Sequence, residues 1–131
     1  MTGLWEKVVE NAKSASLLHE AACFNAAYSR AYYSMFTAAR ILLSEREGIP
    51  LEALKTHASV TRLFSLHFVK QGEFAPELAK AFRRASQERG AADYSGESIS
   101  RDECSEILLV MHDFLDIAAR LSGRQKLGVD D

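Results

Sequence analysis

The sequence contains little cysteine and little proline, with two residues of each among 131. Cys23 and Cys104 do not form a CxxC pair, which argues against a zinc knuckle or a redox pair. We expect both to be packing residues on helix faces. No segment approaches 18 uncharged apolar residues, and the first residues lack the apolar run of a signal peptide. We therefore expect a cytoplasmic protein that does not enter the membrane.

Several motifs that carry chemistry are also missing. There is no GxGxxG, Walker loop, GxSxG or cysteine–histidine nucleophile arrangement. This absence argues only against the hydrolases and nucleotide-binding folds that use these motifs. The four histidines form neither HExxH nor an i, i+4 pair, so we expect no metal site and no cofactor. They are His19, His57, His67 and His112. His67 lies on an apolar stripe, where we expect a hydrogen-bonded core residue.

Composition and periodicity predict an all-α protein. The chain is 47% hydrophobic and 26% charged, as is typical of one globular domain, and we place this domain at residues 1–123 with a frayed polar tail at 124–131. A formal net charge of −2 argues against a nucleic-acid coat protein but permits a local basic patch. No strand-like alternation is present. The fold predicted is an up-and-down bundle of four long helices plus a shorter fifth, with helices at 2–20, 22–47, 57–71, 76–89 and 100–123.

The helix at 22–47 is expected to be central, because apolar residues cover most of its circumference. Its main stripe consists of Phe24, Ala27, Tyr28, Ala31, Met35, Ala38, Ala39 and Leu42. The far side carries Ala26, Arg30, Tyr33, Thr37 and Arg40. That far side is too aromatic for bulk solvent and too polar for a plain core. We interpret it as a second buried face or an interface.

Local chemistry predicts several helix boundaries. Gly48, followed by Ile49 and Pro50, should end the central helix, since glycine accepts the left-handed cap and proline cannot extend a helix. Pro76 is a suitable first-turn residue for the fourth helix. Ser100 and Glu103 have the spacing of a capping box at the start of the last helix. The segment 90–99 between these two helices is predicted to be a loop.

An arginine at the end of an apolar stripe is the main candidate for a functional residue. Arg89 continues the stripe of the fourth helix, and a guanidinium facing a core must be neutralised. One interpretation is an ion pair with Asp93 that ends the helix. The other is that Arg89 and Tyr94, together with the Arg30/Tyr33 face, form a cleft for a phosphate or nucleotide. His57, at the start of the third helix, could point into such a cleft.

Three motifs together resemble those of small stand-alone HEPN-domain proteins, a family named for a nucleotide-binding domain of higher eukaryotes and prokaryotes. They are SRAYYSMFTAARILL at 29–43, His57 opening a helix, and RGAADY at 89–94. The resemblance implies a bundle of four to five helices that is usually a homodimer. It also implies a nucleotide or RNA ligand and a minimal nucleotidyltransferase partner, as in a toxin–antitoxin module.

The chain departs from the ribonuclease members of this family at one position. Those members have a histidine four to six residues after the arginine, whereas the residues after Arg89 include Asp93 and Tyr94 but no histidine. Tyrosine, with a reference pKa of about 10, is a poor general base near neutral pH. Arg62 and His67 approach the spacing but diverge by about 140° around a helix, and we regard that match as chance.

These observations leave three hypotheses. The first is a HEPN-domain protein that binds a nucleotide or RNA and a nucleotidyltransferase without strong catalysis of its own. The second is a metal-independent ribonuclease toxin that uses Arg89 with His57 as catalytic residues. The third is a pure protein-interaction module. The predicted ligand-binding residues are Arg30, Tyr33, His57, Arg89, Asp93 and Tyr94.

Overall fold

The computed structural model describes residues 2–125, apart from the side chains of residues 2 and 90–95. Within this part there are five α-helices and no β-strand. They are α1 (Thr2–Glu20), α2 (Phe24–Glu47), α3 (His57–Phe64), α4 (Pro76–Ser95) and α5 (Arg101–Leu121). A 3-10 turn, η1 (Leu51–Ala53), precedes α3, and a π-helical segment, η2 (Ser65–Val69), continues it. The predicted bundle of four long helices and a shorter fifth is confirmed, with the shorter helix third along the chain.

Helix α2 lies at the centre and contacts each of the other four α-helices. Ala27, Ala31, Met35 and Ala39 are fully buried along its length. Small side chains at several of these positions allow neighbouring helices to approach closely. The expected central position of this helix is therefore confirmed.

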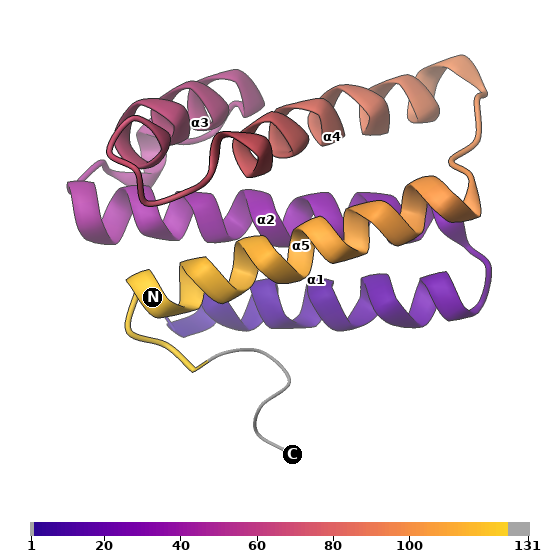
Figure 1. Cartoon of the computed structure of the whole chain (residues 1–131), viewed down its shortest axis with the longest axis horizontal. Helices are drawn as coiled ribbons and strands as arrows, with labels where there is room; N and C mark the ends of the chain where they lie inside the picture. The colour runs from indigo at the N-terminus through magenta and orange to yellow at the C-terminus, as the bar shows by residue number, and fades with distance from the viewer. Residues whose placement is uncertain (1, 126–131) are drawn as a thin grey trace.

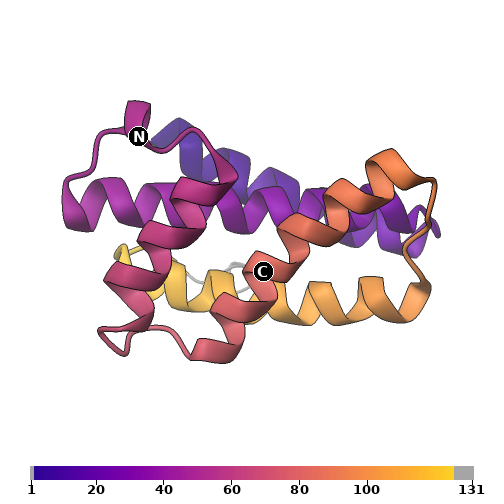
Figure 2. The same cartoon turned by 90° about the horizontal axis from the view of Figure 1, so that it is seen from above.

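The helices form two layers. Figure 1 shows α1, α2 and α5 running roughly side by side, with α3 and α4 above them. Seen from above in Figure 2, α3 and α4 lie obliquely across α2 and α5 and converge at the turn that joins them. The start of α3 and the end of α4 consequently both lie over α2, which contacts both helices.

Four phenylalanines join the two layers. Phe64, Phe74, Phe82 and Phe114 are each at most 1% exposed. Their ring centroids are 4.7 Å apart for Phe64 and Phe74, and 5.2 Å apart for Phe64 and Phe114. Aromatic pairs at such distances contribute about 0.5–1.5 kcal/mol each beyond the burial of their surface. This cluster fixes α3 and α4 on α5.

The predicted caps of α2 and α5 are confirmed. Ser100 Oγ accepts a hydrogen bond from the backbone N–H of Glu103 at 3.1 Å, and Glu103 Oε1 accepts one from the backbone N–H of Ser100 at 2.9 Å. Gly48 adopts φ 72° after the last residue of α2. Pro76 is the first residue of α4, as its missing N–H favours.

Helix α2 begins at Phe24 rather than Ala22. Ala22 has φ 63°, and the N–H of Cys23 donates to the carbonyl of Leu18 at 2.8 Å. This pattern is a Schellman ending of α1, which occupies the residues expected to start the next helix. Cys23 is exposed at the N-cap of α2, so its predicted packing role is wrong. Cys104 is buried in α5, as predicted.

Helix α4 is longer than the sequence predicted. Its backbone continues through Gly90 to Ser95 and ends at Gly96, which has φ 80°. The predicted loop at 90–99 is therefore wrong for residues 90–95, because a helix tolerates an internal glycine at a cost of about 1 kcal/mol. The side chains of Asp93 and Tyr94 lie outside the described residues.

The π-helical segment explains why His67 is not a core residue. The N–H of Lys70 donates to the carbonyl of Ser65 at 3.1 Å, an i+5 bond that inserts an extra residue into the turn. Phe68 is fully buried, and His67 lies partly exposed with Nδ1 3.1 Å from an oxygen of Glu47. The regular 3.6-residue period predicted the wrong face here.

The end of the described chain is held in place at Arg124, where fraying was expected to begin. Its guanidinium donates to both carboxylate oxygens of Glu45, at 2.9 and 3.0 Å, and lies 5.1 Å from the centroid of the Trp5 ring. A bidentate ion pair of this kind fixes the orientation of both side chains and pairs their opposite charges. Residues 126–131 of the predicted tail lie outside the described residues.

None of the helices within residues 2–125 is both long and apolar enough to cross a membrane. Even α2, the longest of them, carries Arg30, Arg40 and Arg46.

Candidate functional site

Seven side chains form an arginine–aromatic cluster where the start of α3 and the end of α4 lie over α2. Helix α2 contributes Arg30, Tyr32, Tyr33, Phe36 and Arg40, α3 contributes His57, and α4 contributes Arg89. Four of these residues, Arg30, Tyr33, His57 and Arg89, were predicted as ligand-binding residues. The fold thus brings together positions that are up to 59 residues apart in the sequence.

Arg89 lies over two tyrosine rings. Its guanidinium carbon is 5.5 Å from the centroid of Tyr32 and 5.2 Å from that of Tyr33. A guanidinium within about 6 Å of a ring face is attracted by the ring quadrupole, by about 0.5–2 kcal/mol depending on solvation. The two rings form an edge-on pair with centroids 5.3 Å apart. They therefore provide a platform that holds the charge of Arg89 beside α2.

A second guanidinium contacts the same platform. Arg30 lies 5.3 Å from the centroid of Tyr33, and its Nη1 donates to Oδ1 of Asn11 on α1 at 3.2 Å. Asn11 is neutral, so this hydrogen bond orients Arg30 without cancelling its charge. Tyr33 consequently has two positive charges near one ring.

His57 is held in the cluster by the first turn of α3. Oγ1 of Thr56 accepts a hydrogen bond from the N–H of Ser59 at 3.1 Å and caps the helix just before His57. The imidazole packs on Phe36 with centroids 4.8 Å apart, and its Nδ1 lies 2.5 Å from the hydroxyl of Tyr32. His57 is therefore anchored to α2 through both its ring face and one nitrogen.

Burial keeps both members of this hydrogen bond neutral, and the charge of Arg89 adds to the effect at His57 alone. Burial, together with the nearby charge of Arg89, lowers the pKa of His57 below its ordinary value. Burial raises the pKa of Tyr32 to about 12. Near neutral pH, the Tyr32 hydroxyl therefore keeps its proton and donates it to the unprotonated Nδ1 of a neutral imidazole.

Arg40 extends the cluster along α2. Its guanidinium carbon is 6.0 Å from the centroid of the Phe36 ring. Its Nε is buried and has no hydrogen-bond partner among the described residues. A buried donor without a hydrogen-bond partner destabilises a fold by about 1–3 kcal/mol, so the presence of Arg40 here needs an explanation.

Sequence reasoning missed part of the cluster. Tyr32 and Phe36 were expected to widen the apolar stripe of the central helix, and Arg40 was placed on the opposite face without a role. The short Tyr32–His57 contact joins residues 25 positions apart, so no local pattern indicates it. The predicted contributions of Asp93 and Tyr94 cannot be placed, because their side chains lie outside the described residues.

The cluster has the chemistry of an anion and base-stacking site. Guanidinium groups bind phosphate through charge-assisted hydrogen bonds, and aromatic rings stack on nucleobases at about 1–3 kcal/mol per base. No group of three or more His, Cys, Asp or Glu side chains able to hold a metal ion is present within residues 2–125, as far as their side chains are described. The cluster itself supplies positive charge, aromatic rings for stacking and one imidazole.

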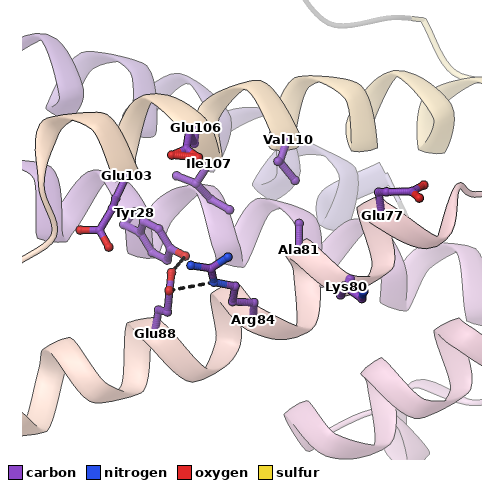
Figure 3. Close-up of a pocket in the computed structure, with 10 residues that line it drawn as sticks. All are labelled: Tyr28, Glu77, Lys80, Ala81, Arg84, Glu88, Glu103, Glu106, Ile107 and Val110. Atoms are coloured by element: carbon purple, nitrogen blue, oxygen red, sulfur yellow. Dashed lines mark hydrogen bonds and ion pairs between the residues drawn. The ribbon is translucent and has the colours of Figure 1, made fainter.

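A separate hollow between α4 and α5 has the opposite character. Its volume is about 250 Å³, and Figure 3 shows Tyr28 and Arg84 both bonded to Glu88 at one end. The Tyr28 hydroxyl donates to Oε1 at 2.6 Å, and Nε of Arg84 donates to Oε2 at 3.0 Å. Further carboxylates line the hollow, from Glu77, Glu103 and Glu106. An excess of carboxylates disfavours phosphate here, so the cluster on α2 is the better candidate site.

Comparisons with known proteins agree with this architecture. The family model of the HEPN domain matches residues 1–121. A Methanocaldococcus jannaschii protein named "Putative toxin MJ0605" is 30% identical over 113 residues, which are 86% of this chain and 81% of that protein. A second protein of that organism, "Putative toxin MJ0142", is 32% identical over 114 residues, which are 86% of this chain and 75% of the relative.

A Pyrococcus horikoshii relative, "UPF0332 protein PH1297", is 44% identical over 71 residues, 54% of this chain and 47% of its own length. No solved structure matches the chain. The family model covers all five helices, including every residue of the arginine–aromatic cluster. The chain therefore belongs to the HEPN domain family.

Proposed function

We propose that this HEPN-domain protein binds a nucleotide or RNA through the arginine–aromatic cluster. The observation that carries the proposal is the placement of Arg89 and Arg30 over the ring of Tyr33, at 5.2 and 5.3 Å. Two guanidinium groups beside one partly exposed ring suit a ligand that has both a phosphate and a stackable base. Tyr33 is only partly buried, so part of its ring remains open to such a ligand.

We further propose a toxin–antitoxin-like role with a minimal nucleotidyltransferase as partner. Support comes from the two relatives whose names describe them as toxins and from the resemblance of the sequence motifs to stand-alone HEPN proteins. Because nucleotides and RNA are present in the cytoplasm, we also propose that the protein acts there.

Strong catalysis by this chain alone is not part of the proposal. The residues after Arg89 contain no histidine at the spacing that ribonuclease members use. The imidazole in the cluster belongs to His57, and its Nδ1 is already bonded to Tyr32. Nδ1 of His57 is thus occupied by a structural hydrogen bond and is not available for proton transfer.

A ribonuclease remains the second candidate because of one observation. Burial and the charge of Arg89 lower the pKa of His57, so its imidazole is neutral near pH 7 and its Nε2 side is not used by the Tyr32 contact. A neutral imidazole beside an arginine is the combination that general-base attack on a phosphodiester requires. His57 would then replace the histidine that is missing after Arg89.

The test replaces Arg89 by methionine, which keeps a flexible apolar stem but removes the charge. Arg83→Met is the matched control, since Arg83 is exposed on the same helix. Fluorescence anisotropy with a labelled single-stranded RNA, and displacement by ATP, report affinity. We expect Arg89→Met to lose tenfold or more, equivalent to about 1.5–3 kcal/mol, and Arg83→Met to lose much less.

The same samples also separate the other candidates. We expect the RNA to stay intact without added metal. Cleavage that disappears in Arg89→Met would favour the ribonuclease instead. Equal binding by wild type and Arg89→Met would contradict the proposed site, and no binding by the wild type would leave a protein-interaction module.

A further inference from the structure

We propose that Arg40 forms a second phosphate subsite at the Phe36 end of the arginine–aromatic cluster, so that the site prefers a strand of two or more nucleotides to a mononucleotide. This inference rests on the proposed function and goes beyond it. It assigns a role to a residue outside the predicted set and narrows the class of ligand.

The first line of evidence is the state of Arg40. Within the described part of the chain its guanidinium contacts the ring of Phe36, at 6.0 Å, and no carboxylate pairs with it. The side chain is partly buried and its Nε fully so. By contrast, Arg124 is paired with Glu45 and Arg46 with Glu73. Arg40 therefore has a partly desolvated charge, and its neutralisation by an anion would be favourable.

The second line of evidence is the order of groups along α2. Arg30, Tyr33, Thr37 and Arg40 follow spacings of three and four residues and so share one stripe of the helix. At 1.5 Å per residue, the backbone positions of Arg30 and Arg40 are about 15 Å apart. Between them, the Tyr33 and Phe36 rings form an edge-on pair with centroids 6.3 Å apart. The order of groups along α2 is thus cation, ring, ring, cation, with the buried Phe36 on the flank of this stripe.

These cations contact different rings, which favours separate phosphates. Arg30 and Arg89 both lie over Tyr33, whereas Arg40 lies over Phe36. A mononucleotide has its phosphate at one end and can satisfy one of these positions. A strand has a phosphate at every nucleotide and can satisfy both while a base stacks between them.

The experiment compares Arg40→Gln with Arg62→Gln, which removes the same charge from an exposed position on α3. The probes are AMP and a labelled single-stranded RNA of about ten nucleotides, a length within the range of known single-strand binding sites. We expect Arg40→Gln to bind the RNA at least tenfold more weakly and AMP as the wild type does. The slope of log K against log salt should fall by about 0.7, the value for one phosphate contact in a single strand. Arg62→Gln should change neither affinity by a comparable factor.

Two other outcomes would overturn the inference while leaving the proposed function intact. Equal loss for AMP and RNA would place Arg40 in a mononucleotide site, and unchanged RNA affinity would give it no ligand role. A change of molecular mass by light scattering in Arg40→Gln would assign Arg40 to a contact between copies and would also overturn it. A wild-type protein that binds neither probe would instead refute the proposed function itself. Circular dichroism melting of both variants confirms that the comparison is between folded proteins.

Discussion

At the scale of single residues, the site depends on contacts between positive charge and aromatic rings. Arg89 was predicted to be important because it continues an apolar stripe, and Figure 2 shows α4, which carries it, crossing α2. Its actual neighbours, Tyr32 and Tyr33, are set by the crossing of the two helices. Sequence periodicity shows which face of a helix is buried, but the ring that a side chain meets depends on helix rotation and crossing angle. This is why Arg89 was predicted and Tyr32 was not.

His57 should make stability depend on pH. In the unfolded chain it takes up a proton near pH 6.5, whereas burial and Arg89 lower its pKa in the folded state. In the window below about 6.5 the unfolded state binds more protons, so the folded state loses stability as the pH falls through it. We expect His57→Gln to show a smaller decrease in the free energy of unfolding between about pH 7.5 and pH 5.

Urea denaturation of both proteins at a series of pH values measures this difference. Above the window the two curves should be parallel, offset by the cost of removing the imidazole from Phe36 and Tyr32. If the decrease is equally steep in both proteins, His57 is not the group that titrates.

At the scale of helices, the sequence correctly predicted those helix ends that depend only on residues close together in the chain. The capping box of Ser100 and Glu103 is such a case, since both hydrogen bonds lie within four residues. The end of α4 was predicted wrongly because Gly90 and Gly96 are both acceptable stops by composition. Only the backbone distinguishes them, with Gly96 at φ 80° and Gly90 inside the helix. The π-helical segment was missed for a similar reason, as no residue type specifies it.

Gly96 provides a test of where α4 ends. Apart from its chain neighbours, no heavy atom of the described residues lies within 4 Å of an added Cβ, so the left-handed backbone is the main cost of Gly96→Ala. We expect it to destabilise the fold by about 1 kcal/mol. Gly3→Ala, equally free of neighbours but within helix α1, should instead be neutral or slightly stabilising. Thermal or urea denaturation measures both, and a harmless Gly96→Ala would place the end of the helix elsewhere.

At the scale of the molecule, the fold class follows from the spacing of apolar residues. The central α2, the long neighbours and the absence of strands in residues 2–125 were all predicted from that spacing. The way that α3 and α4 lie across the lower layer was not predicted. It depends on the contact of Phe74 and Phe114, at 4.9 Å between centroids, which joins residues 40 positions apart that no local pattern pairs.

We predict that the protein is a homodimer through faces of α2 and α4. The face of α2 that carries Arg30 and Tyr33 remains partly exposed in one chain, and the helices described within residues 2–125 leave it incompletely covered. Light scattering at micromolar concentration should give about twice the chain mass of 14.6 kDa. A monomer at that concentration would contradict this prediction and any site shared between copies.

The contact between Arg124 and Trp5 has a spectroscopic consequence. Trp5 is the only tryptophan of the chain, and the guanidinium of Arg124 lies 5.1 Å from its ring. Indole emission is sensitive to a nearby charge, so intrinsic fluorescence reports the docking of the C-terminal segment on α1. The arginine–aromatic cluster contains tyrosines but no tryptophan. One sample can therefore report two events. The fluorescence of a labelled ligand reports binding at the cluster, and the indole emission of Trp5 reports the integrity of the layer that contains α1.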